Sequence, residues 1–184
     1  KNLFLDKKFK TEIIDEEIIF GKLITDDGKY SYKIIDGILS FVGSSNYSSN
    51  FGKQWSIFSK TQLDSYSKIP ISEKRFFNAT NWNKNEIKNK LTLDVGCGAG
   101  RFAEVALKEG ANLIAIDYSY AVKSAYKNLS SFPNFSVIQA DIYNLPFKNE
   151  IFDYVYSLGV LQHTPNVQKA FNCLPIMVKP GGKL

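Results

Sequence analysis

Three glycines lie within five residues in the stretch LTLDVGCGAGRFAEVAL, residues 91–107. The apolar run before them predicts a buried strand, and the residues after them predict a helix. A tight turn needs one or two glycines, whereas Gly96, Gly98 and Gly100 together clear the backbone so that a ligand can approach it. An acid, Asp94, precedes the first glycine by two residues, which a turn built for packing alone does not explain. We therefore expect a ligand-binding loop here.

The residues around these glycines depart from a dinucleotide-binding loop. Such a loop reads G-x-G-x-x-G, whereas Arg101 stands where its third glycine would be. Arg101 also opens the predicted helix, where a positive charge opposes the helix dipole, so we expect an anionic partner from a ligand or a nearby acid. Cys97 lies inside the loop; a small buried side chain is favoured there over a reactive thiol.

Two further acids follow predicted strands. Asp117 ends the run NLIAID, 21 positions after Gly96, where a carboxylate can accept hydrogen bonds from both hydroxyls of a ribose. Asp141 follows the next run, in VIQADIYNLPF, and is placed to accept from the exocyclic amine of adenine, with the backbone N–H of Ile142 facing the ring. Together the two acids predict an adenosine-containing ligand.

The elements that must position these residues alternate between strand and helix over residues 91–184. Strands separated by helices indicate parallel βαβ units, and hence an α/β fold with a doubly wound, mostly parallel sheet. Ligands of such sheets bind beyond the carboxyl ends of the strands, which is where the glycine loop and both acids fall. The predicted strands are 91–95, 112–116, 135–140 and 153–158, and the predicted helices lie near 101–109, 119–129 and 166–178.

The motifs LDVGCGAGR, AIDYS, QADIYNLPF, FDYVYSLGVLQHT and KPGG resemble, in order and spacing, those of class I S-adenosylmethionine-dependent methyltransferases. The resemblance covers residues 91–184 and implies a Rossmann-like sheet with S-adenosylmethionine as cofactor. It implies that Asp94 and the glycine loop hold the methionine part, Asp117 the ribose, and Asp141 with Ile142 the adenine, while the end of the fourth strand approaches the methyl group. The implied cofactor-binding residues are Asp94, Gly96, Cys97, Gly98, Gly100, Arg101, Asp117, Tyr118, Asp141, Ile142, Ser157, Leu158 and Gly159, with no metal ligand.

The single histidine, His163, follows the fourth predicted strand. Its ordinary pKa suits a general base near neutral pH, which methyl transfer needs only when the acceptor is protonated in its resting form. The alternative is a packing or helix-capping histidine before Pro165. Thr164 or Asn166 is expected to cap the next helix.

The sequence of the first half of the chain predicts two smaller segments, a set of β-hairpins and a helical linker. Residues 1–43 read as β-hairpins with turns at Asp27-Gly28 and Asp36-Gly37, and YSYKIIDGILSFV is similar to the second half of a zinc ribbon that precedes many methyltransferases. Residues 1–90 contain no cysteine, so any metal site of such a ribbon is lost. Residues 44–90 read as a helical linker whose aromatic residues pack as a core or, alternatively, form a lid; these are Trp55, Phe58, Tyr66, Phe76, Phe77 and Trp82.

The composition narrows the function classes. The net charge is +5, but only Arg75 and Arg101 of 23 basic residues are arginines, and the lysines are spread out, so nucleic-acid binding is not favoured. No apolar run is long enough for a membrane span, and two distant cysteines favour a reducing cytoplasm. A small-molecule methyltransferase is the leading hypothesis. The alternatives are an RNA methyltransferase, although no N-P-P-Y-type motif follows the fourth strand, and a non-catalytic cofactor-binding protein.

The chain begins at a lysine and ends VKPGGKL. In the family that it resembles, KPGG is the turn into the fifth strand, with two strands still to come. The sequence therefore predicts a fragment whose sheet is truncated near the fifth strand. The fourth strand would then be an exposed edge through which the protein could self-associate.

Overall fold

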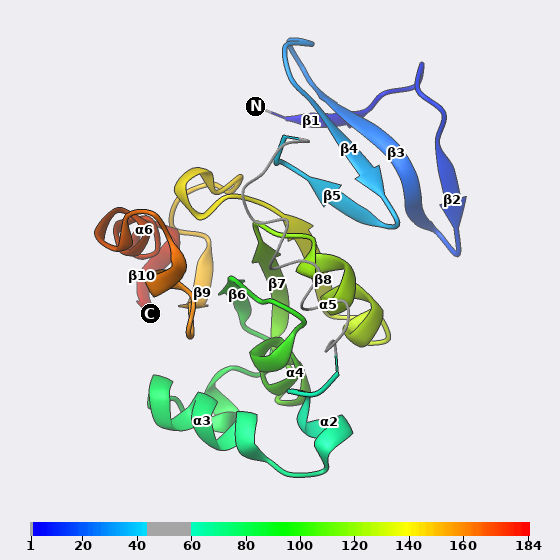
Figure 1. The fold of residues 1–184 in the computed structure, drawn as a ribbon. Helices are drawn as coiled ribbons and strands as arrows, with labels where there is room; N and C mark the ends of the chain where they lie inside the picture. The colour runs from blue at the N-terminus through cyan, green and yellow to red at the C-terminus, as the bar shows by residue number, and fades with distance from the viewer. Residues whose placement is uncertain (1, 44–59) are drawn as a thin grey trace.

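The computed structural model describes residues 2–43 and 60–184. Their strands form one sheet in the order β1-β3-β4-β5-β8-β7-β6-β9-β10, with β2 paired to β3 (Figure 1). The antiparallel strands of the first 40 residues and the parallel strands of the second half thus belong to the same sheet. The interpretations of Trp55 and Phe58 lie outside the described residues.

The second half of the chain has the predicted doubly wound α/β architecture. Its central strands are all parallel and lie in the order β8-β7-β6-β9, so that β6, which leads into the glycine loop, is central. The predicted bounds agree with the structure to within one or two residues. The strands are β6 (Leu91–Val95), β7 (Asn112–Asp117), β8 (Phe135–Gln139) and β9 (Phe152–Tyr156).

Helices cover both faces of these parallel strands because the strands are apolar on both sides. Leu113 and Ala115 of β7 pack in the clusters that contain α4 (Arg101–Lys108) and α5 (Ala121–Leu129). On the opposite face, Ile116 packs in the cluster that contains Leu174 and Met177, which follow α6. The predicted helix over 166–178 is shorter in the structure: α6 spans Val167–Cys173, and a separate 3₁₀ turn, η4, spans Pro175–Met177. Proline at this position has no N–H to continue the α-helical ladder.

The end of the chain departs from the prediction. Residues Val178–Lys183 form β10, which pairs parallel with β9, so KPGG lies inside a strand and β9 is not an edge. The expectation that the sheet stops before a fifth strand and leaves the fourth exposed is wrong. The register shifts by a bulge between Val178, opposite Phe152, and Lys183, opposite Tyr154. Proline and glycine are tolerated in edge strands and at bulges, so this segment can pair with β9 although the family resemblance implied a turn.

The first 40 residues form the predicted antiparallel hairpins. Asp36 and Gly37 both have positive φ, as a two-residue hairpin turn requires. The last strand of this group pairs parallel with β8, Leu39 opposite Ile138, and this pairing joins the hairpins to the parallel sheet. The strands are β1 (Leu3–Leu5), β2 (Glu12–Ile14), β3 (Glu17–Thr25), β4 (Ser31–Ile35) and β5 (Ile38–Ser40).

Contacts with α5 hold the hairpins against the parallel sheet. The Tyr126 hydroxyl donates to Glu17 Oε2 at 2.9 Å, and Lys123 forms an ion pair with Asp36 at 2.7 Å. A Cβ at Gly37 would lie 2.8 Å from the Tyr126 hydroxyl oxygen. This approach and the positive φ together explain the glycine at that turn.

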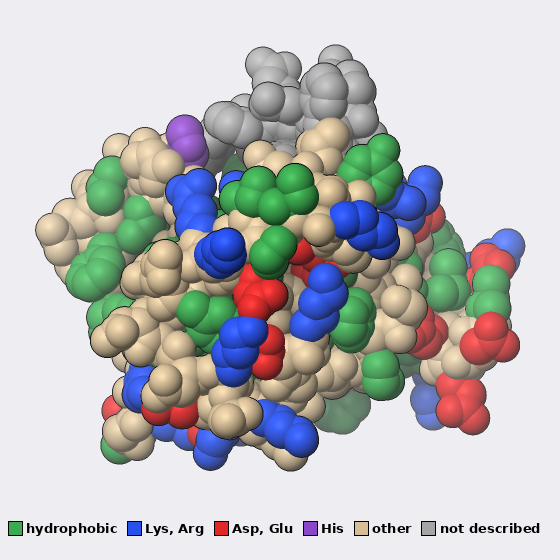
Figure 2. All heavy atoms as spheres, turned by 90° about the horizontal axis from the view of Figure 1, so that it is seen from below, with side chains coloured by type: hydrophobic (Ala, Val, Ile, Leu, Met, Phe, Trp, Pro, Cys, Tyr) green, Lys and Arg blue, Asp and Glu red, His purple; other side chains and the backbone are tan. Residues whose placement is uncertain are grey.

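The short elements that precede β6 pack on α4 (Figure 1). Phe76 is fully buried and makes ring contacts with Trp82, Phe102 and Tyr156, whereas Tyr66 is 63% exposed. Phe76 and Trp82 are therefore core residues rather than parts of a lid. Figure 2, seen from this side, shows lysines and arginines interspersed with carboxylates rather than gathered in one basic patch. The elements are α2 (Asp64–Ser67), α3 (Ile71–Thr80) and the 3₁₀ turn η1 (Lys84–Glu86).

Candidate active site

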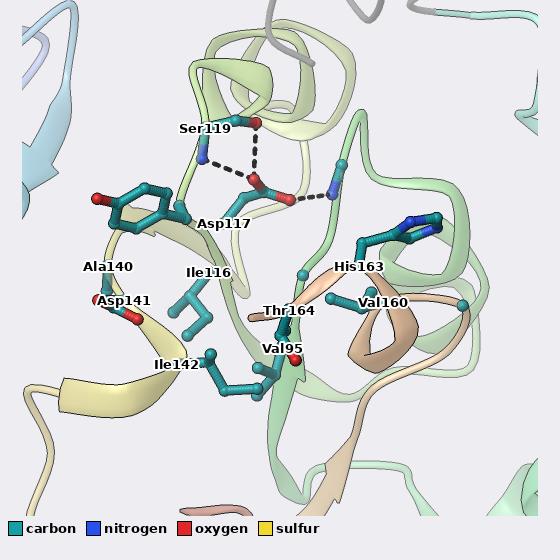
Figure 3. Close-up of a pocket in the computed structure, with 14 residues that line it drawn as sticks. Val95, Ile116, Asp117, Ser119, Ala140, Asp141, Ile142, Val160, His163 and Thr164 are labelled. Atoms are coloured by element: carbon teal, nitrogen blue, oxygen red, sulfur yellow. Dashed lines mark hydrogen bonds between the residues drawn. The ribbon is translucent and has the colours of Figure 1, made fainter. Parts of the chain in front are cut away.

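A hollow of about 210 Å³ opens beyond the carboxyl ends of β6, β7 and β8 (Figure 3). This is the edge at which the topology of a doubly wound sheet leaves room for a ligand. Seven of the thirteen predicted cofactor-binding residues meet here. The described lining residues are Val95, Gly96, Gly98, Ile116, Asp117, Tyr118, Ser119, Ala140, Asp141, Ile142, Gly159, Val160, His163 and Thr164.

The glycine loop folds over the end of the neighbouring strand. The backbone N–H groups of Gly96 and Cys97 both donate to the carbonyl oxygen of Ile116, at 2.8 and 2.9 Å. Gly96 has φ +86°, and a Cβ there would lie 2.4 Å from Val160 Cγ1. Only glycine fits this position, because both the backbone conformation and the approach of Val160 exclude a side chain.

Asp117 joins the loop to the start of α5. Its Oδ2 accepts from Gly98 N at 2.9 Å, and its Oδ1 accepts from Ser119 N at 2.8 Å and from Ser119 Oγ at 2.7 Å (Figure 3). A carboxylate has about four acceptor positions, so these three bonds leave about one for a ligand. The sequence reasoning missed the role of Ser119. Its spacing, two residues after an acid at a strand end, is the signal of an Asp-centred turn.

The adenine side predicted from the sequence is on one wall of the hollow. Asp141 caps the 3₁₀ turn η2 (Ile142–Asn144), where its Oδ1 accepts from Tyr143 N at 2.9 Å. Tyr118 lines the hollow beside it, and its carbonyl accepts from Gln139 Nε2 at 3.0 Å. Asp141 therefore faces the hollow with a fixed carboxylate.

The opposite wall comes from the segment after β9. It consists of Gly159, Val160 and the 3₁₀ turn η3 (Leu161–His163) (Figure 3). His163 is exposed and lies at the hollow, so the structure brings the predicted base to the site. Gly159 has φ +75°, and in the described part of the chain no atom beyond its two neighbours lies within 4 Å of where its Cβ would be. This wall is open beside the strand end that is expected to face the methyl group.

The two capping residues expected after His163 have separate roles. Asn166 caps α6, since its Oδ1 accepts from Lys169 N at 2.8 Å. Thr164 lines the hollow, and its hydroxyl donates to the Leu161 carbonyl at 2.7 Å, which closes η3.

Six predicted cofactor-binding residues do not line the hollow, and four of them have structural contacts. Arg101 donates from Nε to Ser72 Oγ at 3.0 Å, and its guanidinium stacks on the Phe102 ring. Ser157 donates to the Val95 carbonyl at 2.8 Å. Leu158 packs against the apolar core, and Gly100, with φ +95°, is the N-cap of α4. The contacts of these four residues that the structure shows are within the fold rather than at the hollow.

The remaining two, Asp94 and Cys97, are buried beneath the loop. Burial raises the pKa of the Cys97 thiol, and the charges of Asp117 and Asp94 raise it further, so this cysteine is an inert buried side chain. Burial also raises the pKa of Asp94 to about 8; the Asp117 charge adds to this rise, whereas the Tyr156 phenol opposes it. Asp94 is only 3% exposed, and its Oδ2 has no hydrogen-bond partner in the described part of the chain.

The site can be compared with known proteins on this basis. A family model described as "Methyltransferase domain" matches residues 93–184, the C-terminal half of the chain, which contains every residue of the hollow. The chain belongs to this family of S-adenosylmethionine-dependent methyltransferases. The family membership agrees with the glycine loop and with the acids at the ends of β7 and β8.

Two curated relatives and one solved structure illustrate the similarity. The chain is 32% identical over 100 residues to a ubiquinone biosynthesis O-methyltransferase of Coxiella burnetii, covering 53% of this chain and 43% of that protein. It is 31% identical over 103 residues to a tRNA U34 carboxymethyltransferase of Ruthia magnifica, covering 53% of this chain and 32% of that protein. The chain thus spans less than half of these relatives' length.

A putative S-adenosylmethionine-dependent methyltransferase from Methanococcus maripaludis has a similar fold. Its crystal structure superposes with a TM-score of 0.59 at 23% sequence identity, over 76% of this chain and 65% of that chain. The superposed part of this chain is longer than residues 93–184, so the similarity of fold extends beyond the segment that the family model matches.

Two other kinds of feature are absent from the described residues. In residues 2–43 and 60–184, no group of three or more His, Cys, Asp or Glu side chains could hold a metal ion. Within the same residues, no helix has the length and hydrophobicity to span a membrane.

Proposed function

We propose that this protein transfers a methyl group from S-adenosylmethionine to a small-molecule acceptor. One observation carries the proposal: Asp117, fixed by Gly98 and Ser119, faces the same hollow as Asp141 and Ile142. Two carboxylates, which we assign to the ribose and to the adenine amine, therefore converge on one hollow at the carboxyl edge of the sheet.

The residues present fit this cofactor. Asp117 keeps about one acceptor position after its three protein bonds, which is enough for a ribose hydroxyl. Asp94 has a buried oxygen with no protein partner among the described residues, as expected of a group that completes its bonding with a ligand. We propose that Asp94 and the glycine loop, with Arg101 beside it, hold the methionine part, and that Ser157 to Gly159 flank the methyl group.

The cofactor would supply a methyl group already activated by its sulfonium. The protein then has to hold the acceptor's lone pair in line with that methyl group and exclude water, and such positioning supplies much of the acceleration. We propose that the wall formed by Gly159, Val160 and Thr164 faces the acceptor. His163, on the same wall, is the candidate base for an acceptor that carries a proton.

The acceptor class rests on charge and on the relatives. The face drawn in Figure 2 shows interspersed charges rather than the basic stripe typical of a nucleic-acid surface, and the Coxiella relative is named for a small-molecule pathway. The Ruthia relative is named for tRNA, so RNA methylation is the second outcome that the experiment must distinguish.

The experiment is a transfer assay with S-adenosylmethionine labelled in its methyl group. The protein is incubated with a metabolite extract and, in parallel, with total RNA, and the label is followed into low-mass products or RNA. The proposal predicts label in low-mass products. Label in RNA alone would assign the second function. Binding of S-adenosylhomocysteine without any transfer in either arm would indicate a non-catalytic binding protein.

A further inference from the structure

Two buried polar atoms on neighbouring strands have no hydrogen-bond partner in the described part of the structure. They are Oδ2 of Asp94 and the hydroxyl oxygen of Tyr156, and each residue is 3% exposed. Buried polar groups in native proteins almost always have a partner. Two such atoms in one place therefore require an explanation.

The sheet register brings the two residues together. Asp94 of β6 lies opposite Tyr156 of β9 in the parallel pairing, so their side chains emerge from adjacent strands on the same face. Because they are neighbours in the sheet, the two groups affect each other's ionisation: the phenol lowers the pKa of Asp94, while burial and the Asp94 charge raise the pKa of Tyr156. Their geometry nevertheless falls short of a hydrogen bond.

Within residues 2–43 and 60–184, the groups that act on the pair are apolar or can carry negative charge. Tyr156 is packed edge-on against the Phe76 ring from α3, at 5.0 Å between ring centroids. The ionisable groups that act on Asp94 are Tyr156 itself and Asp117, and the Cys97 thiol is also near. None of these supplies a positive charge to balance the Asp94 carboxylate. A cation that entered beneath the glycine loop would supply it.

We propose that Tyr156 is a positioning residue for cofactor binding, whose hydroxyl holds the Asp94 carboxylate toward the ammonium group of the cofactor's methionine part. The inference rests on the proposed function and adds to it a residue that the sequence does not single out. On binding, the ammonium favours the ionised form of Asp94, so the carboxyl loses its proton to solvent while Tyr156 donates to the resulting carboxylate.

This arrangement has a pH signature. Because the pKa of Asp94 stands near 8, the affinity for S-adenosylhomocysteine should rise between pH 6 and pH 8 as the proton becomes easier to remove. Without the Tyr156 hydroxyl the carboxylate loses a donor that stabilises it, and the rise should move to higher pH. A ligand without an ammonium group, such as 5′-methylthioadenosine, should show neither effect.

The test compares Tyr156→Phe with Tyr154→Phe. Tyr154 lies on the same strand and the same face, is 7% exposed and packs on Trp82, so it is a matched control for losing a buried phenol. Calorimetry at pH 6, 7 and 8 measures the affinity for S-adenosylhomocysteine and for 5′-methylthioadenosine. Repeating it in buffers of different ionisation enthalpy counts the protons released.

We expect Tyr156→Phe to weaken S-adenosylhomocysteine binding about three- to tenfold at pH 7, the effect of one net hydrogen bond. The rise of this affinity with pH should move to higher pH in Tyr156→Phe. Its affinity for 5′-methylthioadenosine should stay unchanged, and so should both affinities of Tyr154→Phe. Equal affinity and an equal pH profile in Tyr156→Phe and the unsubstituted protein would overturn the inference. If the unsubstituted protein binds neither ligand, the proposed function itself fails, which is a separate outcome.

Discussion

The Asp117 carboxylate accepts a hydrogen bond from the backbone N–H of Gly98 at 2.9 Å. This bond ties the acid at the end of β7 to the glycine loop at the end of β6. Since Oδ1 of the same carboxylate also holds Ser119, the loop, the strand end and the start of α5 are fixed together before any ligand arrives. Binding to a site organised in this way loses less conformational entropy, because its parts are already ordered.

Replacing Asp117 should therefore affect both binding and stability. Asp117→Ala removes the ribose acceptor, and charge-assisted hydrogen bonds are worth about 1.5–3 kcal/mol each, so S-adenosylhomocysteine affinity should fall at least about tenfold. The melting temperature should also fall, because Gly98 N and Ser119 N lose their acceptor. Asp117→Asn keeps one carbonyl oxygen, so its affinity and melting temperature should lie between those of Asp117→Ala and those of the unsubstituted protein. Calorimetry and thermal unfolding measure the effects, and an unchanged dissociation constant would remove Asp117 from the site.

Asp94 should make stability fall as pH rises. Its folded pKa, about 8, lies above the ordinary value of 3.8, so between these values the native state binds more protons than the unfolded state. The free energy of unfolding then decreases with rising pH. Asp94→Asn removes this effect, so its stability relative to the unsubstituted protein should be higher at pH 8 than at pH 5, as measured by urea unfolding.

Asp153 provides the control of opposite sign. Burial alone would raise its pKa, but Lys179 and the Leu91 N–H hold the pKa below 3.8. Asp153→Asn should therefore destabilise the protein at every pH above about 4, and this loss should disappear only as pH falls through the lowered pKa. A stability difference between Asp94→Asn and the unsubstituted protein that is the same at pH 5 and pH 8 would contradict the account of Asp94.

Phe76 should behave as a core residue. It is fully buried between α3 and α4, so Phe76→Ala should cost about 3–5 kcal/mol in free energy of unfolding. Tyr66→Ala, at a site 63% exposed, should change it by less than about 0.5 kcal/mol. Urea unfolding measures both, and a small cost for Phe76→Ala would revive the lid interpretation.

His163 should separate binding from turnover. The side chain is exposed and lies on the wall opposite Asp141 (Figure 3), so His163→Ala should leave S-adenosylhomocysteine affinity within about twofold, because it removes no buried contact. Turnover should fall if the acceptor must be deprotonated. A large loss of cofactor affinity in His163→Ala would place the imidazole against the cofactor instead.

The sequence predicted those parts of the fold in which local pattern and tertiary structure agree. The runs that became β6 to β9 are apolar and bounded by turn residues, and Gly96 stands where only glycine fits against Val160. The position of Asp117 could be predicted because an acid at the end of the second strand lies beside the first strand's loop.

The features that the sequence did not predict depend on contacts between distant segments, which no local pattern encodes. The β10 strand contains proline and two glycines, so its strand character comes from pairing with β9 rather than from propensity. The pairing of Leu39 with Ile138 links residues about 100 positions apart. The approach of Asp94 to Tyr156 depends on the register between β6 and β9, and Tyr156 alone reads as one more apolar strand residue.

Calorimetry with two ligands tests directly whether the hollow is a site for S-adenosylmethionine. S-Adenosylhomocysteine and NAD share an adenosine, but the loop of Gly96, Gly98 and Gly100 followed by Arg101 departs from the dinucleotide pattern. We expect micromolar-range binding of S-adenosylhomocysteine, as for a nucleotide-sized ligand in a preformed site, and much weaker binding of NAD. Tighter binding of NAD than of S-adenosylhomocysteine would contradict this assignment.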